Sequence, residues 1–242
     1  MSPVGSNTSP PPVAALVIDF DGTIVEQDMS EEILQAFAPP AWWDIDLEFQ
    51  RGEIGSRECL TRQAALLSGR RDDMLTFATS QYTLDPTFAP FVRWASEAGL
   101  PVTVASDGLG FYVAPMLAAA GVEGVQVMTN EVTLEPGAPP SFAFPNGHPV
   151  CRGCGTCKML IVLFERQRHG PVAFIGEGHT DRYGALYADV VFAKKWLQQI
   201  AADDGVPYIA WETFDDVRGA LKRIDLLPGP VGPAKCPGWT EP

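Results

Sequence analysis

Basic residues are scarce in this sequence of 242 residues, which has 17 Lys and Arg against 30 Asp and Glu and a formal net charge of −13. A surface of this sign repels the phosphates of nucleic acids and of anionic membranes, so we exclude both as partners. An anionic substrate stays possible, but it requires a metal ion or local basic side chains to offset the acidic surroundings.

Long apolar runs are also missing. No stretch approaches the roughly 20 residues that a membrane-spanning helix needs. Residues 1–12 contain no basic residue and no apolar core, so we expect a disordered leader and no signal peptide. Residues 227–242 are rich in Pro and Gly and are expected to form a loose tail. The five cysteines are an odd number in a chain without an export signal, which favours reduced thiols in the cytoplasm.

Strand and helix patterns alternate along most of the chain. A strand is predicted at 14–20, a helix start with a hydroxyl cap at Ser30, and helical patterns without a convincing strand as far as Ser80. Further strands are predicted at 101–105, 125–128, 172–175 and 190–192, helices at 88–98, 109–120 and 158–168, and a hairpin at 134–144. This alternation predicts an α/β fold with a doubly wound parallel sheet. We expect a Rossmann-like core, residues 13–27 and 85–226, and a small helical cap, residues 28–84, inserted after the first strand.

Two acidic residues follow the first predicted strand in the stretch ALVIDFDGT. Asp19 and Asp21 are two apart, so the period of a strand turns both carboxylates to one side and Phe20 to the other. Two carboxylates this close repel each other unless a cation lies between them or one is protonated. Mg²⁺, a hard ion with oxygen ligands, is the usual solution. The alternative is an ordinary strand-to-loop turn, in which Asp and Gly are common.

Three further polar groups stand at similar positions. Ser106 follows the second predicted strand, and Lys158 opens a predicted helix, where the helix dipole disfavours a cation. Glu177 and Asp181 follow a later strand and are four apart, so a helical turn places them on one side. Each also has an ordinary explanation, as a helix cap, a solvated lysine or acids at a helix start. Ligands of such sheets bind beyond the carboxyl ends of the strands, where most of these residues are predicted to lie.

The order acid pair, hydroxyl, lysine, acid pair resembles the haloacid dehalogenase superfamily of phosphotransferases, over nearly the whole chain. The stretch DFDGT from Asp19 stands at the family's D-x-D-G-T signature. The resemblance implies Asp19 as the nucleophile that forms an aspartyl phosphate, and Asp21 as the acid for the leaving group and then the base for water. It implies that Ser106 donates to phosphoryl oxygens and that Lys158 offsets their charge. The Mg²⁺ ligands that it implies are Asp19, Asp21, Glu177 and Asp181.

The same resemblance assigns neighbouring residues to substrate binding: Gly22, Thr23, Asp28, Asp107 and Gly108. Asp28 stands where phosphoserine phosphatases usually carry Glu, which argues mildly against phosphoserine. Asp107 stands where the related families usually have Gly, and a Ser-Asp pair there is more typical of phosphoethanolamine and phosphocholine phosphatases. The alternative for Asp107 is a helix N-cap. Glu177 replaces the family's usual Asp, and because Mg²⁺ is strict about geometry, weaker metal binding, lower turnover and simple accommodation are all open.

The position of the helical insertion is typical of the phosphoserine-phosphatase-like branch. Local stretches such as FAPPAWW, CGTCK and ADVVFAK resemble the methionine-salvage phosphatases that act on 2-hydroxy-3-keto-5-methylthiopentenyl-1-phosphate. The predicted function is therefore Mg²⁺-dependent hydrolysis of a small phosphorylated metabolite. The methionine-salvage enolphosphate is the leading substrate, and phosphoethanolamine, phosphocholine and phosphoserine are alternatives. The oligomeric state is left open.

Two other classes of function stay open. Cys151, Cys154 and Cys157 form a C-x2-C-x2-C pattern, with His148 before it and Cys236 far downstream, and this spacing suits zinc or an iron–sulfur cluster. The second class is a protein that binds phosphate or a partner without turnover. It stays open because Glu177 in the fourth motif departs from the family pattern. A receiver-like phosphoacceptor is disfavoured by the large insertion and by the second aspartate of the first motif.

Overall fold

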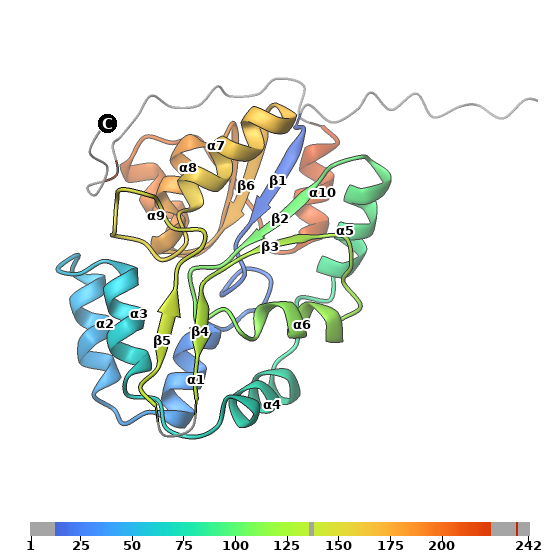
Figure 1. Cartoon of the computed structure of the whole chain (residues 1–242). Coiled ribbons are helices and arrows are strands. Elements are labelled where there is room, and N and C mark those ends of the chain that lie inside the picture. Colours follow the sequence, from blue (N-terminus) through green and yellow to red (C-terminus); the bar gives the residue numbers. More distant parts are fainter. Residues whose placement is uncertain (1–12, 136–137, 224–235, 237–242) are drawn as a thin grey trace, which may run out of the picture.

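A parallel sheet forms the centre of the molecule. The computed structural model describes residues 13–135, 138–223 and 236. Within these residues, six parallel strands form one sheet in the order β3-β2-β1-β6-β7-β8. The strands are β1 (Ala15–Ile18), β2 (Val102–Ala105), β3 (Gln126–Met128), β6 (Val172–Gly176), β7 (Val190–Ala193) and β8 (Ile209–Ala210). The strand order reverses between β1 and β6, so the predicted doubly wound α/β fold is confirmed (Figure 1).

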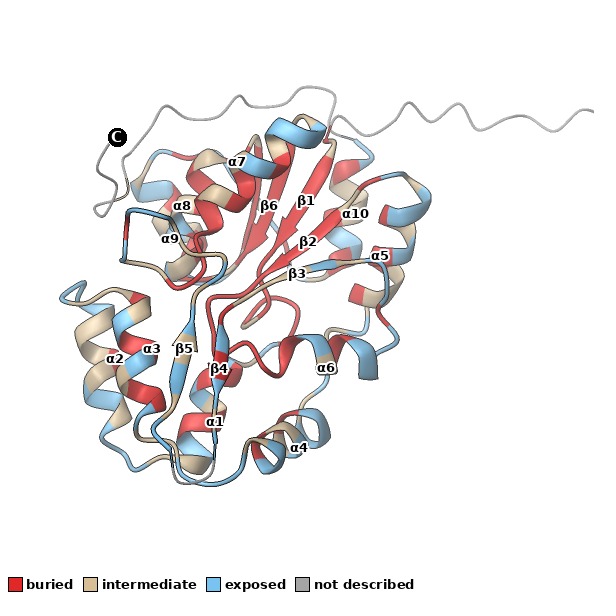
Figure 2. Cartoon of the chain, in the orientation of Figure 1, coloured by how far each residue is buried: buried red, intermediate tan, exposed pale blue. Residues whose placement is uncertain are grey.

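Helices cover both faces of this sheet. They are α5 (Phe88–Glu97), α6 (Val113–Ala119), α7 (Lys158–His169), α8 (Arg182–Tyr187), α9 (Trp196–Asp203) and α10 (Phe214–Leu221). Leu16 and Ile18 of β1 pack in the half of the core that includes side chains of α5, α6 and α10. Ala15 and Val17 pack in the other half, with side chains of α7, α8 and α9. Burial on both faces explains why the central strands are continuous apolar runs (Figure 2).

Four helices follow β1 in the chain and precede α5: α1 (Met29–Phe37), α2 (Trp42–Gln50), α3 (Ser56–Ala64) and α4 (Arg71–Gln81). We call them the cap helices. Helix α2 packs against α3 and α1 against α4, and the α2–α3 pair stands beyond the carboxyl ends of the strands (Figure 1). The residue boundaries of a separate cap stay a prediction. None of the helices in the described part of the chain is long and apolar enough to cross a membrane.

The segment after Ser106 differs from its prediction. A helix was expected over 109–120, but α6 begins only at Val113. Gly110 has φ +82°, which an α-helix does not accommodate, and a Cβ there would lie 1.9 Å from the carbonyl oxygen of Asn130. The chain therefore turns closely past Asn130 before the helix starts.

A short antiparallel hairpin follows β3. Its strands are β4 (Glu131–Thr133) and β5 (Ser141–Ala143), so it begins a few residues before the predicted range of 134–144. The chain then runs through residues 144–157 into α7. This segment, which we call the cysteine loop, contains Cys151, Cys154 and Cys157 and ends directly before Lys158.

Candidate active site

Asp19 and Asp21 lie just beyond the carboxyl end of β1. The chain turns at Gly22, which has φ +72°, and the backbone N–H groups of residues 23–25 all donate to the carbonyl oxygen of Phe20. Phe20 is fully buried in the core, whereas both aspartates line one cavity. The structure therefore brings the two carboxylates to the same side of the turn.

Lys158 lies at the centre of the site. Its Nζ donates to Asp19 Oδ1 and to Asp181 Oδ1, each at 2.6 Å, and to Thr180 Oγ1 at 3.1 Å. Burial alone would lower the pKa of Lys158, but the adjacent carboxylates of Asp181 and Asp19 raise it, so the ammonium form persists. Burial and the charge of Asp181 raise the pKa of Asp19, and Lys158 opposes this effect. Lys158, the first residue of α7, therefore links Asp19 of the first motif to Asp181 of the fourth motif.

Asp21 is held by three donors. Its Oδ1 accepts from Tyr112 Oη at 2.9 Å and from the Met29 N–H at 3.1 Å, and its Oδ2 accepts from Ser106 Oγ at 3.0 Å. Burial and the nearby charge of Asp28 raise the pKa of Asp21 to about 7, although the donors lower it. A carboxyl group with such a pKa both gives and takes a proton at neutral pH, as general acid–base catalysis requires.

Sequence reasoning missed Tyr112 and misassigned Ser30. The Ser30 hydroxyl lies 3.0 Å from Tyr112 Oη and accepts from the Leu109 N–H at 3.1 Å. Ser30 was expected to cap a helix, but it lies inside α1, and Asp28 is the cap residue. No local signal marked Tyr112, because its partner Asp21 is 91 residues away in the chain.

The fourth motif forms a tight turn. Asp181 ends a short 3-10 helix, His179–Asp181, and its Oδ2 accepts from the backbone N–H groups of Glu177, at 2.8 Å, and Gly178, at 3.0 Å. Its other oxygen is bound to Lys158. The segment is a short helical turn, as the spacing predicted, and the Asp181 carboxylate folds back onto the start of that turn.

Glu177 reaches the first motif instead. A Cβ at Gly22 would lie 2.5 Å from Glu177 Cδ, so the side chain covers the Gly22 backbone directly. Burial and the charge of Asp181 raise the pKa of Glu177. Lys195 Nζ lies 3.6 Å from Glu177 Oε2 and donates to the carbonyl oxygens of Gly22 and Glu26. Lys195 is a further site residue that the sequence patterns did not indicate.

The predicted substrate-binding residues fall into two groups. Gly22, Asp28, Asp107 and Gly108 line the cavity. Asp28 is the cap of α1, where its Oδ1 accepts from two backbone N–H groups. Thr23 is not among the lining residues described; its hydroxyl donates to Asp19 Oδ2 at 3.2 Å and so orients that carboxylate. For Thr23, an orienting role fits the structure better than the predicted contact with substrate.

Asp107 is not a helix cap, because α6 begins at Val113 with Tyr112 as its cap residue. The Asp107 carboxylate is buried, and protein donors occupy both of its oxygens: Ser56 Oγ on Oδ2, and Thr156 N and Asn130 Nδ2 on Oδ1. The prediction that Asp107 binds substrate stays a prediction, and its protein contacts join α3 to the segment before Lys158.

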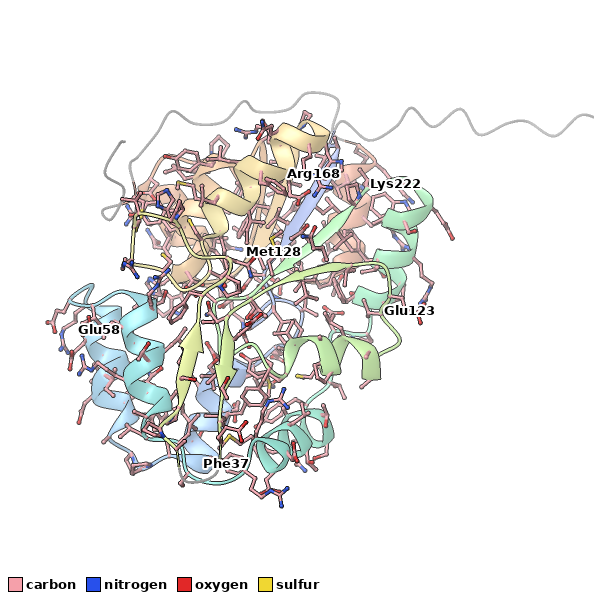
Figure 3. All side chains as sticks on the ribbon, in the orientation of Figure 1. Phe37, Glu58, Glu123, Met128, Arg168 and Lys222 are labelled. Carbon is pink, nitrogen blue, oxygen red and sulfur yellow. The ribbon has the colours of Figure 1, made fainter. Side chains whose placement is uncertain are left out.

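A cavity of about 540 Å³ lies between the cap helices and the carboxyl ends of the strands. Of the described residues that line it, eight are acidic: Asp19, Asp21, Glu26, Asp28, Glu31, Asp46, Asp107 and Glu177. Leu34, Phe49 and Leu60 of the cap helices add apolar surface. Arg168 and Lys222 lie at the opposite end of the core (Figure 3).

The carboxylates at the strand ends suit a hard divalent cation. Asp19, Asp21, Glu177 and Asp181 outnumber their neighbouring cations, Lys158 and Lys195, so negative charge is left uncompensated in a buried place. Oxygen ligands of this kind fit Mg²⁺. As placed, no group of three or more His, Cys, Asp or Glu among the described residues converges to hold a metal ion, and Lys158 bridges Asp19 and Asp181.

The cysteine loop shows no such charge excess. Burial raises the pKa of Cys157 to about 11 and that of Cys154 further, so both thiols are protonated at neutral pH. The described residues, which include Cys236, contain no cluster of three metal-ligating side chains here. The zinc and iron–sulfur hypothesis therefore gains no support from this arrangement.

The haloacid dehalogenase-like hydrolase family matches residues 16–185, which is more than half of the chain. The chain belongs to this family, and it is a hydrolase of the phosphatase type, as the motif order predicted. Two of its relatives match most of its length. A protein of Brevibacillus brevis is 32% identical over 216 residues, 86% of this chain and 95% of the relative. A protein of Geobacillus kaustophilus is 30% identical over 215 residues, 88% of this chain and 97% of the relative. Both are named 2-hydroxy-3-keto-5-methylthiopentenyl-1-phosphate phosphatase.

Solved structures of phosphoserine phosphatases share the fold. One of them, which holds an analogue of a phospho-aspartyl intermediate, superposes with a TM-score of 0.65 over 88% of this chain and 99% of that chain. The two sequences are 17% identical, so this likeness establishes the fold alone. The resemblance to the phosphoserine-phosphatase-like branch is confirmed at that level.

Proposed function

We propose that this protein hydrolyses a small phosphomonoester through an aspartyl phosphate on Asp19. One observation carries the proposal: Asp19 is paired at 2.6 Å with the buried ammonium of Lys158, beside Asp21, whose pKa is about 7. A carboxylate nucleophile needs a nearby positive charge, and an acid–base group works best with a pKa near the working pH. Both requirements are met on the same edge of the sheet.

The proposed hydrolysis has two steps, transfer of the phosphoryl group to Asp19 and its transfer to water. In the first, an Asp19 carboxylate oxygen attacks phosphorus, the bond to the leaving-group oxygen breaks, and Asp21 gives that oxygen its proton. In the second, Asp21 takes a proton from water, whose oxygen attacks phosphorus and breaks the bond to Asp19. Inorganic phosphate leaves, and both carboxyl groups return to their starting forms. Ser106 donates to the phosphoryl oxygens, and Lys158 offsets their charge.

We propose that Mg²⁺ is the cofactor, held by Asp19, Asp21, Glu177 and Asp181. When bound, the ion supplies positive charge that favours ionised Asp19 and offsets the charge of the phosphoryl oxygens. Glu177 is accommodated because glycine at position 22 leaves room for its longer side chain. Lys195 holds the backbone of this turn through the carbonyl oxygens of Gly22 and Glu26.

The leading substrate is the methionine-salvage enolphosphate. Relatives that cover most of the chain carry that name. The cap side of the cavity supports the choice, because Leu34, Phe49 and Leu60 offer apolar surface that suits a methylthio group. Gly22 and Gly108 line the cavity beside the reacting carboxylates, where bulkier residues would take up space for the phosphoryl group.

A phosphomonoester that also carries an ammonium group, such as phosphoethanolamine, phosphocholine or phosphoserine, is the second candidate. The observation that favours it is the acidic wall formed by Asp28, Glu31 and Asp46 of the cap helices. Burial and the charges of Asp28 and Asp46 raise the pKa of Glu31 to about 7, and a bound ammonium group would relieve this repulsion.

Phosphate release from a panel of phosphomonoesters tests both candidates. The panel contains the methionine-salvage enolphosphate, phosphoserine, phosphoethanolamine, phosphocholine and p-nitrophenyl phosphate, each with Mg²⁺. We expect the enolphosphate to give the highest kcat/KM, and the Asp19→Asn variant serves as the blank. Preference for phosphoethanolamine or phosphocholine would move the assignment to a substrate that carries an ammonium group. No release from any compound by folded, Mg²⁺-loaded protein would overturn the proposed function.

A further inference from the structure

The start of cap helix α3 is docked on the cysteine loop. The Arg57 N–H donates to the carbonyl oxygen of Gly153 at 3.2 Å, and Arg57 Nε donates to that of Cys154 at 3.1 Å. The Arg57 guanidinium also lies 4.6 Å from the centre of the Phe144 ring. This loop leads directly into Lys158, so one cap helix touches the segment that carries a catalytic residue.

Asp107 joins the same two segments from the core side. Its Oδ2 accepts from Ser56 Oγ of α3 at 2.5 Å, and its Oδ1 accepts from the Thr156 N–H at 2.7 Å. Asn130 Nδ2 donates to Asp107 Oδ1 at 3.1 Å, and Asn130 Oδ1 accepts from Thr156 Oγ1 at 3.1 Å. The Gly155 N–H donates to Ser56 Oγ at 3.4 Å. One buried carboxylate therefore connects the cap with the residues beside Ser106 and Lys158.

The close fit at this contact depends on glycines. A Cβ at Gly55 would lie 2.2 Å from the carbonyl oxygen of Gly153, and a Cβ at Gly155 would lie 2.6 Å from Asp107 Oδ1 and from Asn130 Oδ1. A side chain at position 55 would push α3 away from the loop, and one at position 155 would push the loop away from Asp107 and Asn130. At Gly55 and Gly153 the two backbones are therefore in direct contact.

Asp107 depends on these partners energetically. Burial raises its pKa, and the bonds from Ser56, the Thr156 backbone and Asn130 oppose that shift. Removing one donor from a buried, ionised group leaves it under-bonded, which is a large penalty in a nonpolar place. Of its two oxygens, Oδ2 has a protein donor only when α3 is docked, whereas Oδ1 keeps the Thr156 N–H and Asn130.

We propose that Asp107 is a positioning residue that locks cap helix α3 onto the cysteine loop and thereby couples cap closure to the placement of Ser106 and Lys158. The inference rests on the proposed phosphatase function and deepens it. Asp107 directly follows Ser106 in the chain, and its partner Thr156 is two residues before Lys158. When α3 moves away, Asp107 loses Ser56, the loop loses Arg57, and both catalytic segments lose a support. A protein-bound role replaces the contact with a substrate cation.

The test uses Ser56→Ala, which removes the cap side of the lock and leaves every proposed catalytic group in place. Thr61→Ala is the matched control, because Thr61 is exposed and its hydroxyl bonds within α3, to the Arg57 carbonyl oxygen. We expect Ser56→Ala to lower kcat about 10-fold. The factor should be the same for p-nitrophenyl phosphate and for phosphoethanolamine, because Ser56 acts on the position of the catalytic segments and not on one substrate. The double variant with Asp107→Asn should lose little more than Asp107→Asn alone, because both changes break the same contact.

Hydrogen exchange supplies a readout that does not depend on turnover. With inorganic phosphate and Mg²⁺ present, amides of residues 56–64 and 153–158 should exchange about 5-fold faster or more in Ser56→Ala, and at the wild-type rate in Thr61→Ala. Wild-type kcat and wild-type exchange in Ser56→Ala would overturn the lock. So would an Asp107→Asn defect confined to substrates that carry an ammonium group, which would identify a substrate contact. If the wild-type protein releases no phosphate from any compound, the proposed function fails, and the exchange rates alone decide whether the lock exists.

Discussion

Replacing Lys158 by Met removes a positive charge from the centre of the site and keeps a side chain of similar length. Lys158 Nζ lies 2.6 Å from both Asp19 Oδ1 and Asp181 Oδ1, and the side chains are 1%, 6% and 0% exposed, respectively. Removal of one partner from a buried ion pair typically costs about 3–5 kcal/mol, because a charge is left without compensation. This is a large share of the roughly 5–15 kcal/mol that stabilises a domain. We therefore expect a folded but much weakened variant.

Urea unfolding in chelator measures the effect directly. The free energy of unfolding of Lys158→Met should fall by about 3–5 kcal/mol, and added Mg²⁺ should stabilise the variant more than the wild type, because the divalent ion compensates the same carboxylates. Phosphate release should fall about 10²- to 10³-fold, the usual loss for one electrostatic group in an active site. Lys222→Met, at the far end of the core (Figure 3), serves as the control and should change stability by less than about 0.5 kcal/mol.

The reasoning would be refuted by a Lys158→Met variant whose free energy of unfolding in chelator equals that of the wild type. That result would mean that Asp19 and Asp181 are not both ionised beside Lys158, and that the pairing contributes nothing to folding. Loss of activity without loss of stability would support the role of Lys158 in catalysis and would exclude its contribution to the free energy of unfolding.

Three further outcomes are expected. Asp19→Asn should lower phosphate release by at least about 10³-fold with an unchanged circular dichroism spectrum, and release at the wild-type rate would exclude Asp19 as the nucleophile. EDTA should abolish phosphate release and excess Mg²⁺ restore it, whereas full activity in chelator would contradict metal binding by Glu177 and Asp181. Gly22→Ala should lower stability by about 1–2 kcal/mol or more, because φ is +72° and the new Cβ would lie 2.5 Å from Glu177 Cδ. An unchanged urea midpoint for that variant would show that Glu177 does not pack over Gly22.

The fourth motif shows what residue spacing gives and what it leaves out. Spacing of four residues favoured a helical turn with Glu177 and Asp181 on one side, and a short 3-10 helix forms there. Within this turn the Asp181 carboxylate accepts from the backbone N–H groups of Glu177 and Gly178, which the spacing did not predict. Its second oxygen then meets Lys158, and Glu177 is directed to Gly22. The spacing therefore placed both acids in one turn, but it did not give the contacts of either side chain.

The fold class, and the meeting of the candidate catalytic residues at one edge of the sheet, were predictable from the chain alone. Apolar runs that alternate with amphipathic helices favour a parallel sheet, and polar residues placed directly after such runs gather at one edge, because parallel strands end together. Asp19, Asp21 and Ser106 met there for that reason. The predicted helix over 109–120 failed at its start, where Gly110 passes close to Asn130, a contact between segments that no local pattern encodes.

Partners distant in the chain were visible only after folding. Tyr112 reaches Asp21 across 91 residues, Ser56 reaches Asp107 across 51, and Lys195 reaches the Gly22 carbonyl oxygen across 173. Periodicity and spacing report on neighbours within a few residues, so they place a carboxylate at a strand end but not the donors that surround it. The three-dimensional packing of cap against core therefore decided which acids are available for chemistry and which, like Asp107, are already engaged by the protein.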